Sequence, residues 1–407
     1  MPVSRSKLRR GELLRRSCLV VLSSLLAIAL AEVVLRVGGQ HIVAEGEWLA
    51  VGRLLKTDDD LLGYSLNPGS RRLATMGGDF AFITRINSAG FRDVDHPVEK
   101  PLDRKRILVL GDSFIFGAGV PEEETLTRRL ESGTPGTEVI NTGVPGYDLG
   151  QEYLFYKVRG RRYRPDLVLL AFFINDLTLV PELEVIDDPE GLPAAYRYRP
   201  EVERKLERRD QPTRNPITIV ARWLTDHSAL YLLIHQRLSS HGGGEIIPGG
   251  RDVFVFKSEY DEATSRAWER AYRILDDLKR LSIENGSRLA VILVPAPWQT
   301  SREAWLEWVA SQKLPEDSLS RTRPQEMVTA WCARSATPCL DLREAFEQGD
   351  VHQLYFRHDQ HWTSSGHRLA AMNVAQFLRA NHLIGPRRPH HREEEMSAPA
   401  GSAAPRD

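Results

Sequence analysis

Five short apolar runs recur along the middle of the chain, with amphipathic stretches between them. The runs cover residues 106–110, 137–144, 165–173, 288–295 and 338–343. Apolar residues at helical spacing cover residues 122–131, 151–163, 261–286 and 365–382. Short apolar runs predict strands, and the helical spacing predicts amphipathic helices. This alternation predicts a parallel sheet that is covered by helices on both faces and joined by right-handed crossovers.

Three segments depart from this alternation. Residues 40–100 combine alternating and aromatic residues with Asn-Pro-Gly and Ala-Gly turns, which predicts a small β-rich lead-in. Residues 177–258 interrupt the pattern after the third strand, which predicts an insertion of the kind that shapes substrate access. Residues 386–407 are polar and rich in Pro and Ala, which predicts a disordered tail. We therefore expect the main domain over residues 101–385.

The N-terminus carries a targeting signal. Residues 1–16 hold six Lys and Arg residues, and a largely apolar segment follows over residues 17–37. Basic residues before an apolar segment favour a cytoplasmic N-terminus and an exported remainder. We expect a retained single-pass membrane anchor, and the alternative is a signal peptide cleaved after Ala31. Both place the main domain outside the cytoplasm, while a third interpretation is a buried helix of the soluble domain.

Composition narrows the class of partner. The 54 Lys and Arg residues nearly balance the 55 Asp and Glu residues, so no overall field points to nucleic acid. Cys332 and Cys339 bracket a short loop and could pair in an oxidising compartment, or they could both be unpaired small residues. The chain has no Cys/His spacing typical of zinc, and we expect neither a metal nor a cofactor.

Polar motifs stand at strand ends or could reach them. They are Gly111-Asp112-Ser113, the stretch NTGVPG at 141–146, Asn175-Asp176, and Asp359-Gln360-His361. Ligands of open parallel sheets bind at the carboxyl ends of the strands. The glycines at 111, 117 and 119 fit neither a Walker loop nor a dinucleotide fingerprint. The sequence does not match the Gly-x-Ser-x-Gly nucleophile elbow of α/β-hydrolases either, because Ile115 stands where the second glycine should be.

These four motifs, in this order, resemble the SGNH/GDSL hydrolase family over roughly residues 100–380. The resemblance implies a flavodoxin-like, five-stranded parallel sheet and a serine hydrolase. It assigns the nucleophile to Ser113 and the remainder of a catalytic triad to Asp359 and His361. It assigns the oxyanion hole to the backbone N–H groups of Ser113 and Gly146 and to the side-chain amide of Asn175.

Elementary chemistry supports each of these roles. A serine hydroxyl is a poor nucleophile until a base accepts its proton, and histidine suits that task near neutral pH. A carboxylate orients the imidazole and stabilises its charged form. Three converging donors would hold the tetrahedral oxyanion, and the loss of one such donor costs about 10²–10³ in rate.

Two positions depart from the family's pattern. Phe173 stands where the family usually has a glycine, two residues before the Asn, which predicts a reshaped pocket floor that keeps the donor. The family's usual Asp-x-x-His is shortened here, because only Gln360 separates Asp359 from His361. Alternate side chains of an extended segment point the same way, so we expect these two residues in a loop. The alternative is a Ser-His dyad whose ring is oriented by another carboxylate or a carbonyl.

Other interpretations of the same residues stay open. Asn175-Asp176 could be only a turn or a helix cap after a strand. The group His358, Asp359, His361 and His367 could suggest a metal site, although His367 belongs to the following helix pattern. We interpret the stretch INSAGFRD at 86–93 as scaffolding that brings Arg92 near the site.

The resulting expectation is a membrane-tethered, extracytoplasmic serine esterase. It would cleave short acyl esters, such as acetyl groups on a cell-surface glycan, through an acyl-serine intermediate. The alternative is a polysaccharide O-acyltransferase that uses the same triad. A non-catalytic glycan-binding or assembly protein on a hydrolase scaffold is the third possibility. The sequence does not indicate an oligomeric state.

Overall fold

A computed structural model describes residues 5–37, 55–76, 79–204, 252–357 and 359–384, with a few positions between 216 and 231. The central element is a five-stranded parallel sheet with the strand order β11-β10-β7-β5-β6. Its strands are β5 (Lys105–Leu110), β6 (Thr137–Asn141), β7 (Leu167–Phe172), β10 (Arg288–Leu293) and β11 (Cys339–Asp341). All five lie at the runs that the sequence predicts, which confirms the fold class of the main domain.

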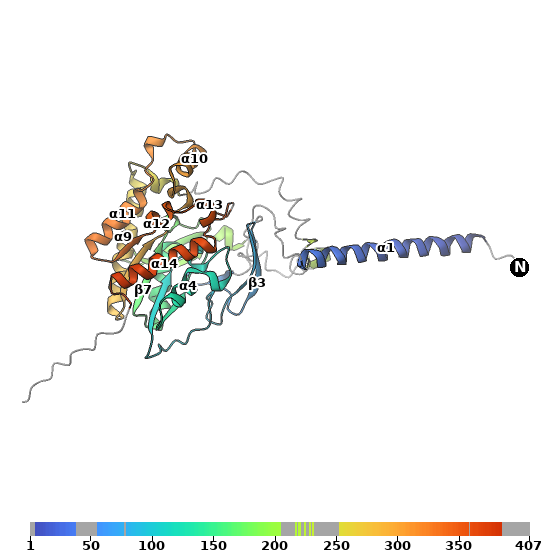
Figure 1. The fold of residues 1–407 in the computed structure, drawn as a ribbon, viewed down its shortest axis with the longest axis horizontal. Coiled ribbons are helices and arrows are strands. Elements are labelled where there is room, and N and C mark those ends of the chain that lie inside the picture. The colour runs from blue at the N-terminus through green and yellow to red at the C-terminus, as the bar shows by residue number, and fades with distance from the viewer. Residues whose placement is uncertain are drawn as a thin grey trace, which may run out of the picture.

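Helices cover both faces of this sheet (Figure 1). One face carries α4 (Leu126–Gly133), α12 (Arg343–Glu347), α13 (Val351–Leu354) and α14 (Ser364–Ala380). The other carries α5 (Leu149–Val158), α9 (Glu262–Glu284) and α11 (Arg323–Ser335). A third apolar cluster lies around η4 (Val253–Phe256), η5 (Pro297–Gln299) and α10 (Arg302–Gln312). The short elements α3 (Ser113–Phe116), η1 (Glu122–Glu124), η2 (Gly160–Tyr163), η3 (Ile174–Leu177) and η6 (Glu316–Ser318) complete this part of the fold.

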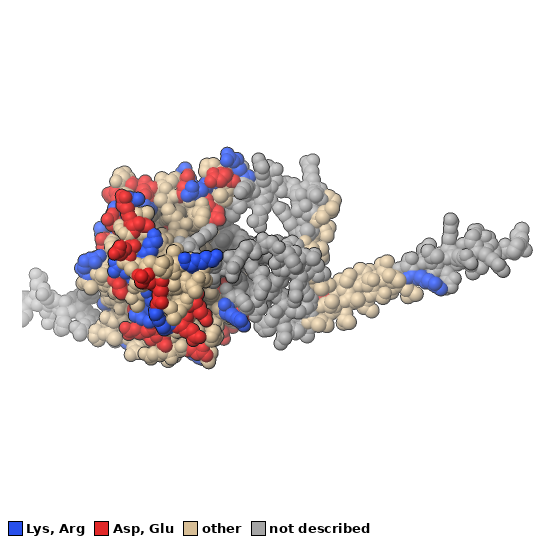
Figure 2. Space-filling model, turned by 90° about the horizontal axis from the view of Figure 1, so that it is seen from above, with Lys and Arg blue, Asp and Glu red and all other residues tan. Residues whose placement is uncertain are grey.

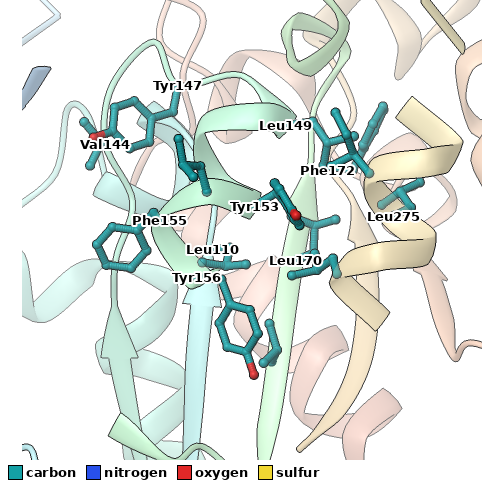
Figure 3. Close-up of a cluster of buried hydrophobic side chains, with 14 of the residues drawn as sticks. Leu110, Val144, Tyr147, Leu149, Tyr153, Phe155, Tyr156, Leu170, Phe172 and Leu275 are labelled. Carbon is teal, nitrogen blue, oxygen red and sulfur yellow. The ribbon is translucent and has the colours of Figure 1, made fainter. Parts of the chain in front are cut away.

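The alternation of side chains along the strands explains the two layers. In β5, Ile107 and Val109 pack under α4 and α14, while Leu108 and Leu110 pack under α5 and α9. All four are at most 1% exposed, so the strand is buried on both faces and its sequence is continuously apolar. Figure 3 shows the α5 side, where Tyr153 and Leu275 of two helices meet the sheet.

Small antiparallel hairpins flank the sheet. They are β1 (Leu55–Asp59) with β2 (Gly63–Leu66), β3 (Arg71–Met76) with β4 (Phe80–Arg85), and β8 (Leu183–Asp187) with β9 (Pro193–Tyr198). The first two lie in the predicted β-rich lead-in, and the third opens the predicted insertion. The predicted tail 386–407 and most of the insertion between 205 and 251 lie outside the described residues.

The N-terminal element needs a correction. A single helix, α1 (Arg5–Val37), extends away from the domain (Figure 1). The sequence predicts an apolar element over residues 17–37, but the helix begins twelve residues earlier and includes the basic residues. Within the described part of the chain, no helix is long and apolar enough to cross a membrane. The predicted transmembrane anchor is therefore not supported.

Charged side chains of both signs are interspersed over the face of the domain in Figure 2. A buried cluster of four charged or titratable side chains, Asp93, His96, Arg106 and Glu138, attaches the lead-in to the edge strand β6. His96 bonds through Nε2 to Asp93 (3.0 Å) and through Nδ1 to Glu138 of β6 (2.8 Å). Glu138 also accepts from Nε of Arg106 (2.6 Å), and Asp93 accepts from the Asn141 N–H (2.8 Å).

We predict that this group makes folding stability depend on pH. Burial lowers the pKa of His96, but hydrogen bonds and charges of Asp93 and Glu138 outweigh it and raise the pKa to about 9. A raised pKa stabilises the fold fully below the ordinary value of 6.5, and this contribution is lost as pH rises through about 9. Urea unfolding should show a fall of up to about 3 kcal/mol between pH 6 and pH 9.5. The fall should be smaller in His96→Gln, and parallel curves for the two proteins would contradict the prediction.

Candidate active site

The strand order fixes where a site can form. β5 and β7 are neighbours although β6 lies between them in sequence, so the strand order reverses at this pair. Such a switch point leaves a crevice at the carboxyl ends of the strands. Ser113 follows β5 and Asn175 follows β7, so both lie at this crevice.

Ser113 opens the short helix α3, and two polar groups fix that helix at its ends. The Asp112 carboxylate accepts from the Phe114 N–H (2.9 Å) and caps the first turn. The buried Arg92 donates to the Phe116 carbonyl (2.9 Å) and to the carbonyls of Gly117 and Val120. Arg92 thus lies behind the nucleophile turn, so the lead-in does act as scaffolding for it.

A tight loop at residues 355–362 carries Asp359 and His361. Tyr355 and Trp362 pair across its base, and the Phe356 N–H donates to the His361 carbonyl (2.9 Å). Gln360 adopts a left-handed conformation with φ of 63°. The loop is therefore not an extended segment, and the turn at Gln360 is what brings its two neighbours together. His358 lies outside the described residues.

The loop brings the three predicted triad residues into one hydrogen-bonded line. His361 Nε2 lies 2.7 Å from Ser113 Oγ, and His361 Nδ1 lies 2.7 Å from Asp359 Oδ2. The Asp359 side chain is fully buried, and the His361 side chain is 13% exposed. Asp79, between β3 and β4, accepts from the Asp359 N–H (2.8 Å) and ties the lead-in to this loop.

The surroundings of His361 set its charge. Burial lowers the pKa of His361, but the charge and hydrogen bond of Asp359, with the charge of Asp112, outweigh burial and raise it. The next histidine behaves differently: His367 is 1% exposed and accepts from the Leu126 N–H (3.1 Å). Burial lowers the pKa of His367 to about 3, so it is neutral and serves the start of α4.

The stretch after β6 approaches the nucleophile turn closely. A Cβ on Gly143 would lie 2.3 Å from the Phe116 nitrogen, so only glycine lets the two segments pack together. Gly146 has φ of 80° in a turn closed by a bond from the Tyr147 N–H to the Val144 carbonyl (3.1 Å). The described residues offer no acceptor to the N–H groups of Ser113 and Gly146, whereas the Gly143 N–H donates to the Asn141 side chain (3.0 Å). The role of Gly146 as an oxyanion donor stays a prediction.

Asn175 contacts a partner that the sequence did not suggest. Its Nδ2 donates to Asp112 Oδ2 (2.8 Å), an oxygen that lies 3.4 Å from Ser113 Oγ. The amide carries a second hydrogen, which remains for an oxyanion. Asp112 therefore links the nucleophile turn to the third motif, and the role of Asn175 in an oxyanion hole stays a prediction.

Sequence reasoning also missed the acidic side chains beneath the site. Asp112, Asp148, Glu152 and Asp176 are each at most 4% exposed. One signal was available in the sequence: Glu152 lies three residues after Leu149 and four before Tyr156, on the apolar stripe of its helix. A charged residue at such a position indicates a buried polar group.

Cys332 at the end of α11 and Cys339 at the start of β11 form a disulfide, with Cα atoms 6.2 Å apart. The bond joins the last crossover helix to the edge of the sheet, away from the triad.

A protein-family model described as "SGNH hydrolase-like domain, acetyltransferase AlgX" matches residues 247–404. This stretch contains Asp359 and His361, whereas Ser113, Gly146 and Asn175 precede it in sequence and join it in space. The match covers less than half of this chain, and it supports the SGNH/GDSL hydrolase family. Alginate biosynthesis protein AlgX of Pseudomonas aeruginosa is 28% identical over 141 residues, which are 32% of this chain. They are 27% of AlgX, so the match spans about a quarter of that protein.

Solved structures resemble this chain at low identity. The acetyl xylan esterase AlAXEase is 13% identical with a TM-score of 0.37, covering 68% of this chain and 98% of its own. A lipase/acylhydrolase from Enterococcus faecalis is 11% identical with a TM-score of 0.36, covering 68% and 96%. A member of the lipolytic G-D-S-L family from Veillonella parvula is 12% identical with a TM-score of 0.35, covering 67% and 97%.

We predict that the reaction of Ser113 with a fluorophosphonate probe depends on the Asp359–His361 pair. His361 must be neutral to accept the serine proton, so the labelling rate should rise with pH through a midpoint above 6.5. In Asp359→Asn the midpoint should fall, because the group that raises the pKa of His361 is gone. The plateau rate should fall by about 10²–10⁴.

The matched control is Asp350→Asn, which removes an exposed carboxylate from the same region and should leave the profile unchanged. Ser113→Ala should take no label. An unchanged profile in Asp359→Asn would instead favour a Ser-His dyad.

Proposed function

We propose that this chain is a serine enzyme that takes short acyl groups from esters through an acyl-Ser113 intermediate. The observation that carries the proposal is the continuous line from Ser113 Oγ through His361 to Asp359, with both contacts at 2.7 Å. This reaction needs no bound cofactor, because the side chains themselves supply the nucleophile, the base and the orienting acid.

The proposed reaction has two halves. His361 accepts the Ser113 proton as Oγ attacks the ester carbonyl, and the N–H groups of Ser113 and Gly146 with the Asn175 amide hold the oxyanion. The oxyanion collapses, the C–O bond to the alcohol breaks, and His361 returns the proton to that leaving oxygen. In the second half an acceptor hydroxyl gives its proton to His361 and attacks the acyl-serine, which frees Ser113 Oγ to take the proton back.

The acceptor distinguishes two enzymes. Water as acceptor makes the chain an esterase, which is the leading candidate from the triad alone. A sugar hydroxyl makes it a polysaccharide O-acyltransferase, and the name of the matching family, acetyltransferase AlgX, favours this second candidate. Acetyl groups on an extracytoplasmic glycan suit both. The Cys332–Cys339 disulfide supports an oxidising, non-cytoplasmic compartment as part of the same proposal.

Phe173 supports a short acyl group. It follows β7 at the carboxyl edge of the sheet, and its partly exposed ring lies 4.6 Å from the Phe114 ring. Phe114 in turn lies 4.9 Å from the His361 ring. Phe173 is therefore separated from His361 by one aromatic ring, and its large side chain, in place of the family's glycine, would fill space that a longer acyl chain needs.

We predict that wild-type protein hydrolyses p-nitrophenyl acetate and that Ser113→Ala does not. Asn175→Ala should lower kcat by about 10²–10³, because one oxyanion donor is lost. Adding alginate-type or other anionic oligosaccharides should separate the two acceptors. A transferase releases p-nitrophenol faster and adds acetyl mass to the sugar, while an esterase does neither. No turnover of any acetyl ester, with no covalent label on Ser113, would overturn the proposal.

We predict that Phe173→Gly broadens the acyl preference. The rate for butyryl relative to acetyl p-nitrophenyl esters should rise by about tenfold or more, since each methylene that a pocket accepts is worth about 1–3 kcal/mol. Turnover of the acetyl ester by the same variant is the control for an intact triad. An unchanged butyryl-to-acetyl ratio would show that another side chain limits the acyl pocket.

A further inference from the structure

Four buried carboxyl groups lie beneath the site, and the reaction above uses none of them directly. They come from the turn after β5 (Asp112), the N-cap of α5 (Asp148), the first turn of α5 (Glu152) and η3 (Asp176). Their exposed fractions are 1%, 2%, 1% and 4%, respectively. Because α5 packs against η3, the group lies directly under the segment that holds Asn175.

These carboxyl groups differ in how many hydrogen bonds they accept from the protein. Asp112 accepts from Phe114 and Asn175. Asp148 accepts on one oxygen from the Gln151 N–H (2.9 Å) and the Tyr196 hydroxyl (2.7 Å). Burial still raises the pKa of Asp112, and that of Asp148 to about 6, so these donors offset the cost of burial only in part.

Glu152 has no such support. Neither of its carboxyl oxygens has a hydrogen-bond partner in the described part of the chain. The same holds for Oδ1 of Asp176 and Oδ1 of Asn175, while the other Asp176 oxygen accepts from the Phe173 N–H (3.1 Å). With Oδ2 of Asp148, five acceptor atoms of the described residues therefore lie in this buried region without a donor. Each unsatisfied group costs about 1–3 kcal/mol. A protonated carboxyl is a donor as well as an acceptor, so protons on Glu152 and Asp176 reduce this imbalance.

The electrostatics favour the same state. Burial raises the pKa of Glu152 well above its ordinary value, and the charges of Asp176, Asp112 and Asp148 raise it further. Burial and the charge of Asp112 likewise raise the pKa of Asp176, against the Phe173 N–H, which lowers it.

The neighbouring elements bring little positive charge to this group. From α9, Asp277 binds the Tyr153 hydroxyl, and Arg270 pairs with Asp187 of β8. From β9, Tyr196 binds Asp148. His361 acts on Asp112, where it lowers the pKa, and Asp252 acts on Asp176, where it raises the pKa. The surroundings of Glu152 are therefore acidic or neutral.

We propose that Glu152 and Asp176 are both held protonated, so that the pair is neutral. One proton is shared between the two carboxyl groups, and the other orients the Asn175 amide. The pair donates to Oδ1 of Asn175, which leaves Nδ2 facing Asp112 and the oxyanion. An amide turned the other way would direct its oxygen at the Asp112 carboxylate, where acceptors repel each other. The neutral pair also keeps additional negative charge away from the oxyanion. Glu152 is then a positioning residue, and this role rests on the proposed function.

The first test detects the protonated carboxyl group of Glu152 directly and needs no enzyme turnover. Isotope-edited infrared spectra of the full chain at pH 7 should contain the C=O band of a protonated carboxyl that is absent from Glu152→Gln. Absence of the band in wild-type protein overturns the proposal, whatever the enzyme's activity. Stabilisation of wild-type protein, but not Glu152→Gln, by added Na⁺ or Ca²⁺ would also overturn it, because the group would then bind a cation. A band with no acetyl-ester turnover would mean that the proposed function fails while the shared proton stands.

The second test measures the positioning role of Glu152 by comparing p-nitrophenyl acetate turnover between variants. In wild-type protein kcat should decline at high pH, where Glu152 loses its proton. Glu152→Gln keeps the shape and a donor, so kcat should stay within about threefold and this decline should be absent. Glu152→Leu removes the donor, so kcat should fall about 10–100-fold at unchanged KM. Adding Asn175→Ala to Glu152→Leu should cost much less than it does in wild-type protein.

Asp277→Asn is the matched control, since it neutralises a carboxyl group that contacts α5 but not Asn175, and it should leave kcat and its pH profile unchanged. Equal losses in Glu152→Gln and Glu152→Leu, with both proteins folded by circular dichroism, would overturn the positioning role. If Glu152→Leu fails to fold, the pH profile of Glu152→Gln decides alone: a retained decline at high pH overturns the proposal.

Discussion

The hydrogen bond between Ser113 and His361 is the contact on which the arrangement of this domain depends. It joins positions that are 248 residues apart and therefore requires the whole sheet to be assembled. The two residues that follow His361 are anchored, because Trp362 is fully buried and Thr363 caps α14. On the other side of the contact, Asp112 and Arg92 fix the ends of α3. Rigid supports of this kind matter, because a displacement of about 1 Å at a reacting atom can cost about 10²-fold in rate.

A second constraint is the shortage of positive charge around the site. Four buried carboxyl groups lie beneath the site, and Arg92, which lies behind the nucleophile turn, donates to backbone carbonyls. The carboxyl groups are held by backbone N–H groups, by hydroxyl groups and, in our proposal, by a shared proton. Because these carboxyl groups are buried, their partners matter for stability: an unpaired charge in the interior costs several kcal/mol.

The site chemistry is common to hydrolysis and to acyl transfer up to the acyl-enzyme. What differs is the group that can approach that intermediate. The hairpin β8–β9 opens the insertion and is tied to α5 through Tyr196 and Asp148, so the insertion starts from the helix that lies under the site.

The sequence by itself determined the five strands, the helices of the crossovers and the order of the four motifs. These features follow from the spacing of apolar residues and from short polar motifs, which are local properties of the chain. The same reasoning was wrong about the apolar N-terminal element, because an apolar window does not reveal where a helix begins. It also missed Glu152, although helical periodicity places that residue on the buried stripe.

Only the tertiary structure decided how Asp359 reaches His361, which partner Asn175 has, and which carboxyl groups lie together. The turn at Gln360 depends on the pairing of Tyr355 with Trp362 and on the burial of Trp362 under α14. Asp112, Glu152 and Asp176 meet because the strand order reverses between β5 and β7. Local patterns fix what each segment forms, but contacts between distant segments depend on how the layers pack.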